Sequence, residues 1–148
     1  MDCLFCKIVK KEIPAEIVYE DDATIAFLDI HPRAPGHVMV IPKAHAANLL
    51  ELAAPLVGPL FVAVKKVTAA IAASFCPEGF APLEAEPLTG FTIGINHGRI
   101  SGQAVDHLHV HIMPRFAEDG GGSVHSVVDN PPTEKLAAIA EKIRKEIN

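Results

Sequence analysis

Two features that mark other classes of protein are scarce in this chain of 148 residues. It has only three cysteines, and a small odd number argues against a fold held together by disulfides. Its 18 acidic residues outnumber 13 basic ones, which are scattered and form no basic face of the kind that nucleic-acid-binding proteins carry. We therefore expect a protein that binds no nucleic acid and that holds any phosphate with a few placed donors.

Signals for a membrane or for export are also missing. We find no apolar run of the roughly 18–20 residues that a membrane span requires. The first ten residues, MDCLFCKIVK, have an acid and two cysteines where a signal peptide has basic and then apolar residues. These absences predict a cytoplasmic protein with no membrane partner.

The hydrophobic content of 49% suits one globular domain with its own core. Apolar residues recur at helical spacing between 60 and 71, which predicts a long helix that ends near Phe75. Because Pro55 and Pro59 disfavour a helix interior, we expect either a regular part that begins near Gly58 or a kink in an earlier turn. Short apolar runs bounded by turn residues predict strands at 16–22, 23–30, 37–42, 89–96 and 105–113.

Two segments are predicted to lie outside the strands and the long helix. Residues 76–88 are rich in proline, which predicts a loop. Later, Gly120–Gly122 predict a flexible connection, and an apolar stripe between 136 and 147 predicts an amphipathic C-terminal helix. We therefore divide the chain into a domain of residues 1–116 and an appendage of residues 117–148. The order of elements predicts an α+β fold whose largely antiparallel sheet is covered on one face.

The stretch HLHVHIM carries three histidines at alternate positions of a predicted strand. Because a strand sends alternate side chains to opposite faces, His107, His109 and His111 share one face and the aliphatic residues between them face a core. The outer two lie about 13 Å apart along a strand, so two of the three can share a metal ion but three converge poorly. A neutral imidazole is also a nucleophile for phosphorus. Chance exposure of three histidines is the remaining alternative, which strict alternation disfavours.

Other candidates carry weaker signals. Cys3 and Cys6 form a C-x-x-C pair, which needs two more ligands for a tetrahedral zinc site. Spacing alone does not choose those ligands among His31, His37, His45, His97, His107 and His125. Gln103 ends a glycine-containing turn just before the histidines, and Asp29 ends a predicted strand, where a turn role is the simpler interpretation.

Two stretches resemble a known family. GQAVDHLHVHIMPR resembles the signature of the histidine-triad (HIT) superfamily, and residues 3–45 resemble the N-terminal half of the same family, with a C-x-x-C variant of its prokaryotic, Hint-like branch. Together they span most of residues 1–115. The resemblance implies a HIT-like fold, with about five antiparallel strands and a long helix on one face, to which this chain adds a C-terminal helix.

The resemblance also implies a function. It predicts a hydrolase that cleaves a purine nucleotide at its α-phosphorus from a conjugate similar to an adenosine phosphoramidate, through a covalent intermediate on the nucleophile His109. His111 is expected to hydrogen-bond the phosphate with Asn96 and Gln103, and Asp29 to bind the ribose hydroxyls. A slot for the base is expected from Ile8, Phe27 and Ile30. A dinucleoside polyphosphate hydrolase and a nucleotide-binding module with vestigial activity are the alternatives.

By the same resemblance, Cys3, Cys6, His45 and His107 are expected to hold a structural zinc ion, with no organic cofactor. In relatives without the cysteines, the position of His107 belongs to a proton network, so it also counts among the catalytic histidines. The rival is a zinc hydrolase that uses the triad as ligands. A homodimer joined edge to edge through the sheets is expected, and Ala104 and Asp106 depart from the family pattern.

Overall fold

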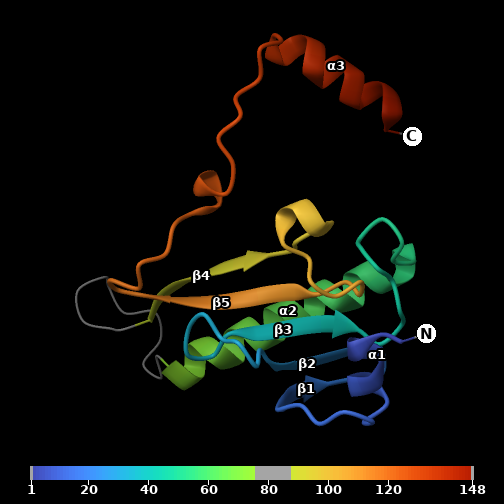
Figure 1. Ribbon diagram of the computed structural model, residues 1–148, viewed down its shortest axis with the longest axis vertical. Helices are drawn as coiled ribbons and strands as arrows, with labels where there is room; N and C mark the ends of the chain where they lie inside the picture. The colour runs from blue at the N-terminus through green and yellow to red at the C-terminus, as the bar shows by residue number, and fades with distance from the viewer. Residues whose placement is uncertain (1, 76–87, 148) are drawn as a thin grey trace.

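The computed structural model describes residues 2–75 and 88–147. Nearly all of the loop expected at 76–88 lies outside these residues. Five strands form one antiparallel sheet in the order β1-β2-β3-β5-β4 (Figure 1). They are β1 (Ile17–Glu20), β2 (Thr24–Leu28), β3 (Val38–Pro42), β4 (Leu88–Gly94) and β5 (Val110–Phe116). The predicted α+β class and sheet are confirmed.

The histidine segment enters the sheet later than predicted. We expected a strand over 105–113, but β5 begins at Val110 and continues to Phe116. Before it, the backbone N–H of Leu108 donates to the carbonyl of Ala46, outside the ladder. The alternation nevertheless holds, because Leu108, Val110 and Ile112 are buried in the core under the long helix.

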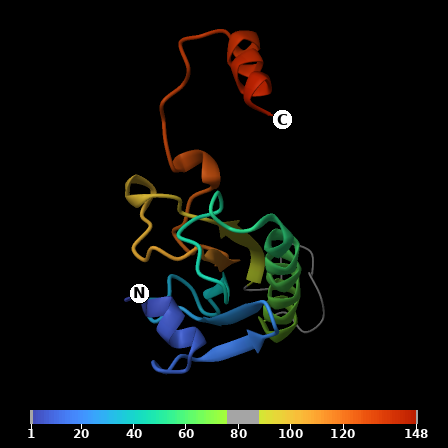
Figure 2. The same cartoon turned by 90° about the vertical axis from the view of Figure 1, so that its right-hand side faces the viewer.

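That helix, α2 (Ala54–Phe75), covers one face of the sheet (Figure 2). It begins four residues before Gly58, so the start expected near Gly58 was wrong. Pro59 lies inside the helix and cannot donate one hydrogen bond. Burial of Leu60 and Val64 against the sheet offsets that loss.

The prediction that no segment is long and apolar enough to cross a membrane was also wrong. α2 has 22 residues with a mean hydropathy of 1.7 in its most apolar window, enough by length and composition to cross a bilayer. One side of α2 packs on the sheet, so the domain uses it as a core helix. Its other side exposes Phe61 and Val62, which are 44% and 53% exposed.

The opposite face of the sheet is partly covered by α1 (Leu4–Val9). Phe5 and Ile8 of this short helix pack with Phe27 and Met39 in a second apolar cluster. Because α1 follows Cys3 and contains Cys6, this packing carries the C-x-x-C pair to the face on which the histidines lie.

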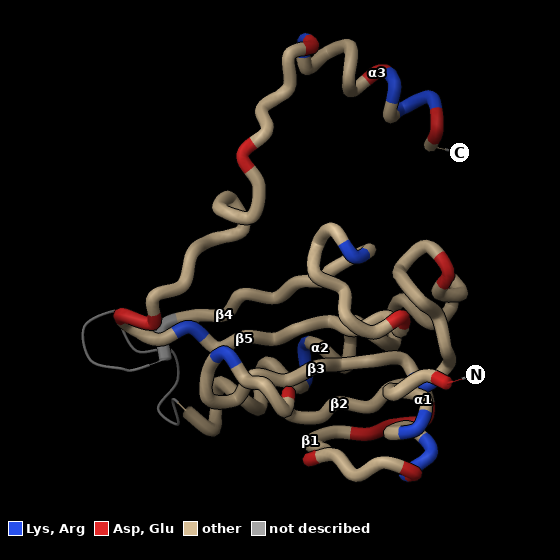
Figure 3. Tube along the Cα trace, viewed as in Figure 1, with Lys and Arg blue, Asp and Glu red and all other residues tan. Residues whose placement is uncertain are grey.

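Beyond β5 the chain leaves the sheet as an extended arm, residues 117–135, which contains the short helix η2 (Val124–Ser126) and leads to α3 (Leu136–Glu146) (Figure 1). The C-terminal helix is thus confirmed, but none of its described residues is buried. Along the described part of the trace, basic positions alternate with acidic ones, in α3 as elsewhere (Figure 3).

Candidate active site and metal centre

His107 is the most deeply buried of the three histidines, with no exposed surface. Its Nε2 lies 2.9 Å from the carbonyl oxygen of Pro42. Because a carbonyl only accepts hydrogen bonds, Nε2 carries the proton and Nδ1 keeps its lone pair. That lone pair faces two thiols, 3.5 Å from Cys3 Sγ and 3.6 Å from Cys6 Sγ.

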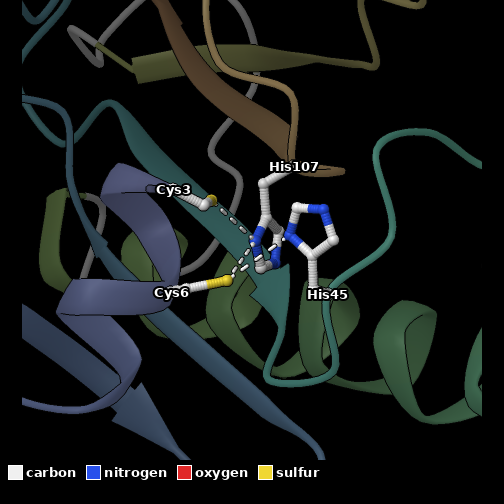
Figure 4. A group of neighbouring side chains, drawn as sticks. All are labelled: Cys3, Cys6, His45 and His107. Atoms are coloured by element: carbon white, nitrogen blue, oxygen red, sulfur yellow. Dashed lines mark hydrogen bonds between the residues drawn. The ribbon is translucent and has the colours of Figure 1, made fainter. Parts of the chain in front are cut away.

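Four side chains meet at this point, Cys3, Cys6, His45 and His107 (Figure 4). The Nδ1 of His45 lies 3.4 Å from Cys6 Sγ, and all four ligand atoms lie within 4.8 Å of one another. Tetrahedral zinc with ordinary bond lengths would separate sulfur and nitrogen by about 3.6 Å. The donor set and its spacing therefore fit a zinc ion.

Burial adjusts the protonation of two of these groups. It lowers the pKa of the His107 imidazole, although the Pro42 carbonyl opposes the shift. Burial raises the pKa of the Cys6 thiol, and the adjacent Cys3 raises it further. A neutral imidazole is ready to bind a metal, and a divalent cation would offset the cost of holding two thiolates together.

His109 makes a different hydrogen bond from that of His107. Its Nδ1 lies 2.7 Å from the carbonyl oxygen of His107, so Nδ1 carries the proton and Nε2 keeps the lone pair. Nε2 of His109 has no hydrogen-bond partner among the described residues. Every fully buried side-chain nitrogen or oxygen in the described part of the chain does have a partner, so Nε2 must be accessible to solvent. Phe5 packs against the ring, edge to face, with centroids 5.3 Å apart. The result is an imidazole of fixed orientation and tautomer on a residue only 5% exposed.

His111 lies beside His109 and belongs to another group. Its Nδ1 is 2.9 Å from Nε2 of His37, and that nitrogen is 3.7 Å from a carboxylate oxygen of Asp29. The three ligand atoms are close enough to surround a cation, but the hydrogen bond between the rings occupies one imidazole lone pair. Burial lowers the pKa of His111 to about 4, helped by the positive charge that His109 and His37 acquire on protonation.

His37 was predicted only as one of six candidate zinc ligands, and the structure instead buries it beside His111. Burial lowers its pKa as well. A sequence signal for this position existed, because strand alternation places His37 and Met39 on one face. Met39 is paired with His111 across β3 and β5. Only the pairing itself reveals that the two histidines meet.

The other phosphate-side candidates lie in the turn before the histidines. The amide of Gln103 is fully engaged: its Oε1 accepts from Gly98, and its Nε2 donates to the carbonyls of Ala47 at 2.7 Å and Val105 at 3.0 Å. Gln103 thus ties the turn to a neighbouring loop. Asn96 is half-buried and lies against Gly102, whose φ of 96° favours glycine.

The residues expected around the base do not share one environment. Ile8 and Phe27 are buried in the cluster under α1, whereas Ile30 is 80% exposed. Phe5, which the sequence interpretation did not single out, contacts the rings of His107, His109 and Phe27. One open cleft, about 460 Å³, is lined by Asp29, Arg33 and His37 among others, and another by His45, Ala104 and Asp106 among others.

Comparison with known proteins identifies sequences and structures that are similar to this chain. The HIT domain family matches residues 10–118. The chain is 40% identical over 147 residues to adenosine 5'-monophosphoramidase hnt1 of Schizosaccharomyces pombe, covering 99% of both chains. It is 38% identical to Protein hit of Bacillus subtilis, covering 99% of this chain and 94% of that one. A crystal structure of a HIT family member from Bacillus subtilis superposes with a TM-score of 0.81 at 35% identity, covering 100% of this chain and 99% of the other.

Proposed function

Because the chain belongs to the HIT domain family, we propose that it hydrolyses purine nucleotide conjugates at the α-phosphorus, in the manner of an adenosine phosphoramidase. The observation that carries the proposal is the geometry of His109. Its Nδ1–H is held by the His107 carbonyl, and its Nε2 lone pair is free and accessible. That arrangement suits an imidazole that attacks phosphorus.

The proposed reaction has two steps. Nε2 of His109 bonds to the α-phosphorus while the bond from phosphorus to the leaving amine breaks, and the amine departs with the electron pair and a proton. Water then attacks phosphorus, the bond to Nε2 breaks, and a nucleoside monophosphate is released with one proton. The first proton comes from an amine that binds already protonated or from a relay through a neighbouring histidine.

The substrate is proposed to lie across the two clefts. Asp29 lines the first cleft and is only 16% exposed at its side chain, where a carboxylate can accept two ribose hydroxyl hydrogen bonds. The base would lie near Ile8, Phe27 and Ile30, and Asn96 and His111 would donate to the phosphate. Gln103 would support this turn, since its amide hydrogens are occupied. The leaving group would occupy the second cleft, beside Ala104 and Asp106.

Cys3, Cys6, His45 and His107 are proposed to hold a structural zinc ion, and no organic cofactor is invoked. The ion would stabilise the junction between α1 and the histidine segment, while His109 and His111 carry out the chemistry. The described cysteines are free thiols, in keeping with a reducing, cytoplasmic environment.

A homodimer is also proposed. Within the described sheet, β4 is an edge strand, and Ile93 on it is 41% exposed. α2 exposes Phe61 and Val62, and α3 exposes its apolar stripe at the end of the arm. A second copy of the chain is the partner that would cover these surfaces. In this proposal residues 1–116 form the catalytic domain and 117–148 form the connection and helix that add to the interface.

The first prediction concerns the nucleophile. His109→Asn should lower hydrolysis of a fluorogenic adenosine phosphoramidate by at least about 10³-fold, because the amide cannot form the covalent intermediate. Wild-type protein denatured in alkali during turnover should show a nucleotidyl adduct on His109 by mass spectrometry, because a phosphorus–nitrogen bond to histidine survives alkali but not acid. Comparable turnover by wild type and variant would contradict the assignment.

The same preparation separates the alternatives. Preferred cleavage of diadenosine polyphosphates over the phosphoramidate would support the dinucleoside polyphosphate hydrolase. Tight binding of adenosine monophosphate without turnover of either substrate would support the nucleotide-binding module.

A further inference from the structure

In each of the three histidines, a backbone group determines which ring nitrogen carries the proton. For His111 this link to the backbone is indirect. His107 and His109 donate directly to the carbonyls of Pro42 and His107. For His111, the neighbouring ring of His37 intervenes. We propose that His37 is a positioning residue that fixes the tautomer of His111, in a hydrogen-bond chain that begins at the backbone amide of Arg33.

The chain begins with an unambiguous donor. The backbone N–H of Arg33 lies 3.1 Å from Nδ1 of His37. A backbone N–H can only donate, so Nδ1 of His37 must accept and cannot carry a proton in this geometry. A neutral His37 therefore carries its one proton on Nε2. Burial, with the side chain only 4% exposed, favours the neutral form.

In the second step, the tautomer of His37 determines the tautomer of His111. The Nε2–H of His37 lies 2.9 Å from Nδ1 of His111, within ordinary hydrogen-bond distance, whereas the carboxylate of Asp29 lies at 3.7 Å. The hydrogen bond therefore goes to His111, and the Asp29 charge stabilises the polarised donor. Because Nδ1 of His111 accepts, the proton of neutral His111 resides on Nε2.

The third step concerns what this tautomer offers to a ligand. Nε2 of His111 has no hydrogen-bond partner among the described residues, and it is open to solvent by the same argument as Nε2 of His109. The two rings lie edge to face with centroids 4.9 Å apart. One ring thus presents a lone pair and its neighbour presents an N–H. A phosphoryl group attacked by His109 would meet a donor from His111, and the opposite tautomer would direct a lone pair at a phosphoryl oxygen.

The donation from His111 to a phosphoryl group rests on the proposed function, but the tautomer of His111 can be tested without it. Long-range ¹H–¹⁵N correlation spectra of ¹⁵N-labelled full-length protein at pH 7.5 distinguish protonated from unprotonated ring nitrogens. We expect His111 with a protonated Nε2 and an unprotonated Nδ1, and the same pattern in His37. A proton on Nδ1 of either ring in wild type would overturn the proposal, whatever the enzyme hydrolyses.

Substitutions at His37 then test causation. His37→Met removes the donor, so we expect a mixed or reversed tautomer at His111 and a fall in kcat of about 10-fold or more. His37→Gln places an amide N–H near the position of the lost Nε2–H and should restore both the tautomer and most of kcat. His125→Met, on the arm, is the matched control.

The outcomes separate this proposal from the proposed function. An unchanged His111 tautomer and unchanged kcat in a folded His37→Met protein would overturn the positioning role. Absence of turnover in wild type with the expected spectrum would instead reject the hydrolase and leave the tautomer chain intact. If both variants fail to fold, the wild-type spectrum remains decisive.

Discussion

At the scale of single residues, three histidines at alternate positions acquire different chemistry from different hydrogen bonds. His107 presents Nδ1 to two thiols, His109 presents Nε2 as a lone pair, and His111 is joined to His37. The alternation in the sequence could not distinguish the three side chains, since it places all of them on one face. Their partners make them unequal, and those partners are backbone carbonyls and a distant ring.

A pH dependence of stability follows from His111. An unfolded histidine has a pKa of about 6.5, whereas folding lowers the pKa of His111 to about 4, with Asp29 opposing the effects of burial and of the neighbouring His109 and His37. Between these values the unfolded chain binds the extra proton, so stability is complete above about pH 6.5 and is lost as the pH falls to about 4. The slope for one proton is at most about 1.4 kcal/mol per pH unit.

We therefore predict that His111→Asn flattens the dependence of unfolding free energy on pH between 6.5 and 4.5 by nearly one proton. Denaturant titrations at several pH values measure this slope. His125→Asn, an exposed position, should leave the slope unchanged. Equal slopes for His111→Asn and wild type would contradict the lowered pKa.

At the scale of elements, α1 illustrates how a short helix acquires a defined place. Six residues are too few for a stable isolated helix. Phe5 and Ile8 bury its inner side against β2 and β3, and the cysteines beside them meet two histidines. Apolar packing and the proposed metal site would therefore both stabilise α1 in its position on the sheet.

Removal of the metal should therefore act mainly on this element. We predict that Cys3→Ser lowers zinc content, measured by mass spectrometry of metals, from about one ion per chain to near zero. The melting temperature should fall by several degrees, and amides of Leu4–Val9 should exchange faster while those of β5 keep most of their protection.

Activity distinguishes the structural role from a zinc hydrolase. If zinc is structural, folded Cys3→Ser protein assayed below its melting transition should retain substantial turnover. Loss of all activity in a folded variant, together with recovery on adding zinc, would favour the rival in which the metal takes part in the reaction. Cys6→Ser provides a second variant at the same site.

At the scale of the whole molecule, the arm and α3 form no compact unit with the sheet. α3 has 11 residues and no buried side chain, so its apolar stripe is unsatisfied within the described chain. Arg115 directs the arm as it leaves β5, because its guanidinium bonds both carboxylate oxygens of Asp119 and the carbonyl of Gly122. A helix held away from its own domain suits an interface with a second copy.

We predict that full-length protein is a dimer by light scattering and that a chain ending at residue 118 dissociates at higher concentration. Ile143→Asp, which places a charge on the stripe, should act in the same direction, whereas Lys145→Gln on α3 should not. An identical dissociation constant for the truncated and full-length chains would place the arm outside the interface. A full-length monomer would reject the dimer itself.

Local periodicity in the sequence was enough to predict the fold class, the long helix with its buried stripe, and the shared face of the three histidines. These features depend on the spacing of apolar and polar residues a few positions apart, which the backbone geometry of a strand or helix converts directly into faces. The start of α2 and of β5 escaped prediction, because tertiary packing outweighed Pro59 in one case and a loop hydrogen bond replaced the ladder in the other.

The convergence of groups far apart in the chain was decided only by the tertiary structure. Cys3 and His107 are separated by 104 positions and His37 and His111 by 74, and spacing left six histidines as equal candidates for the zinc. The docking of α1 brings the first pair together, and the register that pairs Met39 with His111 brings the second pair together. A sequence determines which side chains share a face, but the pairing of strands and the packing of helices determine which faces meet.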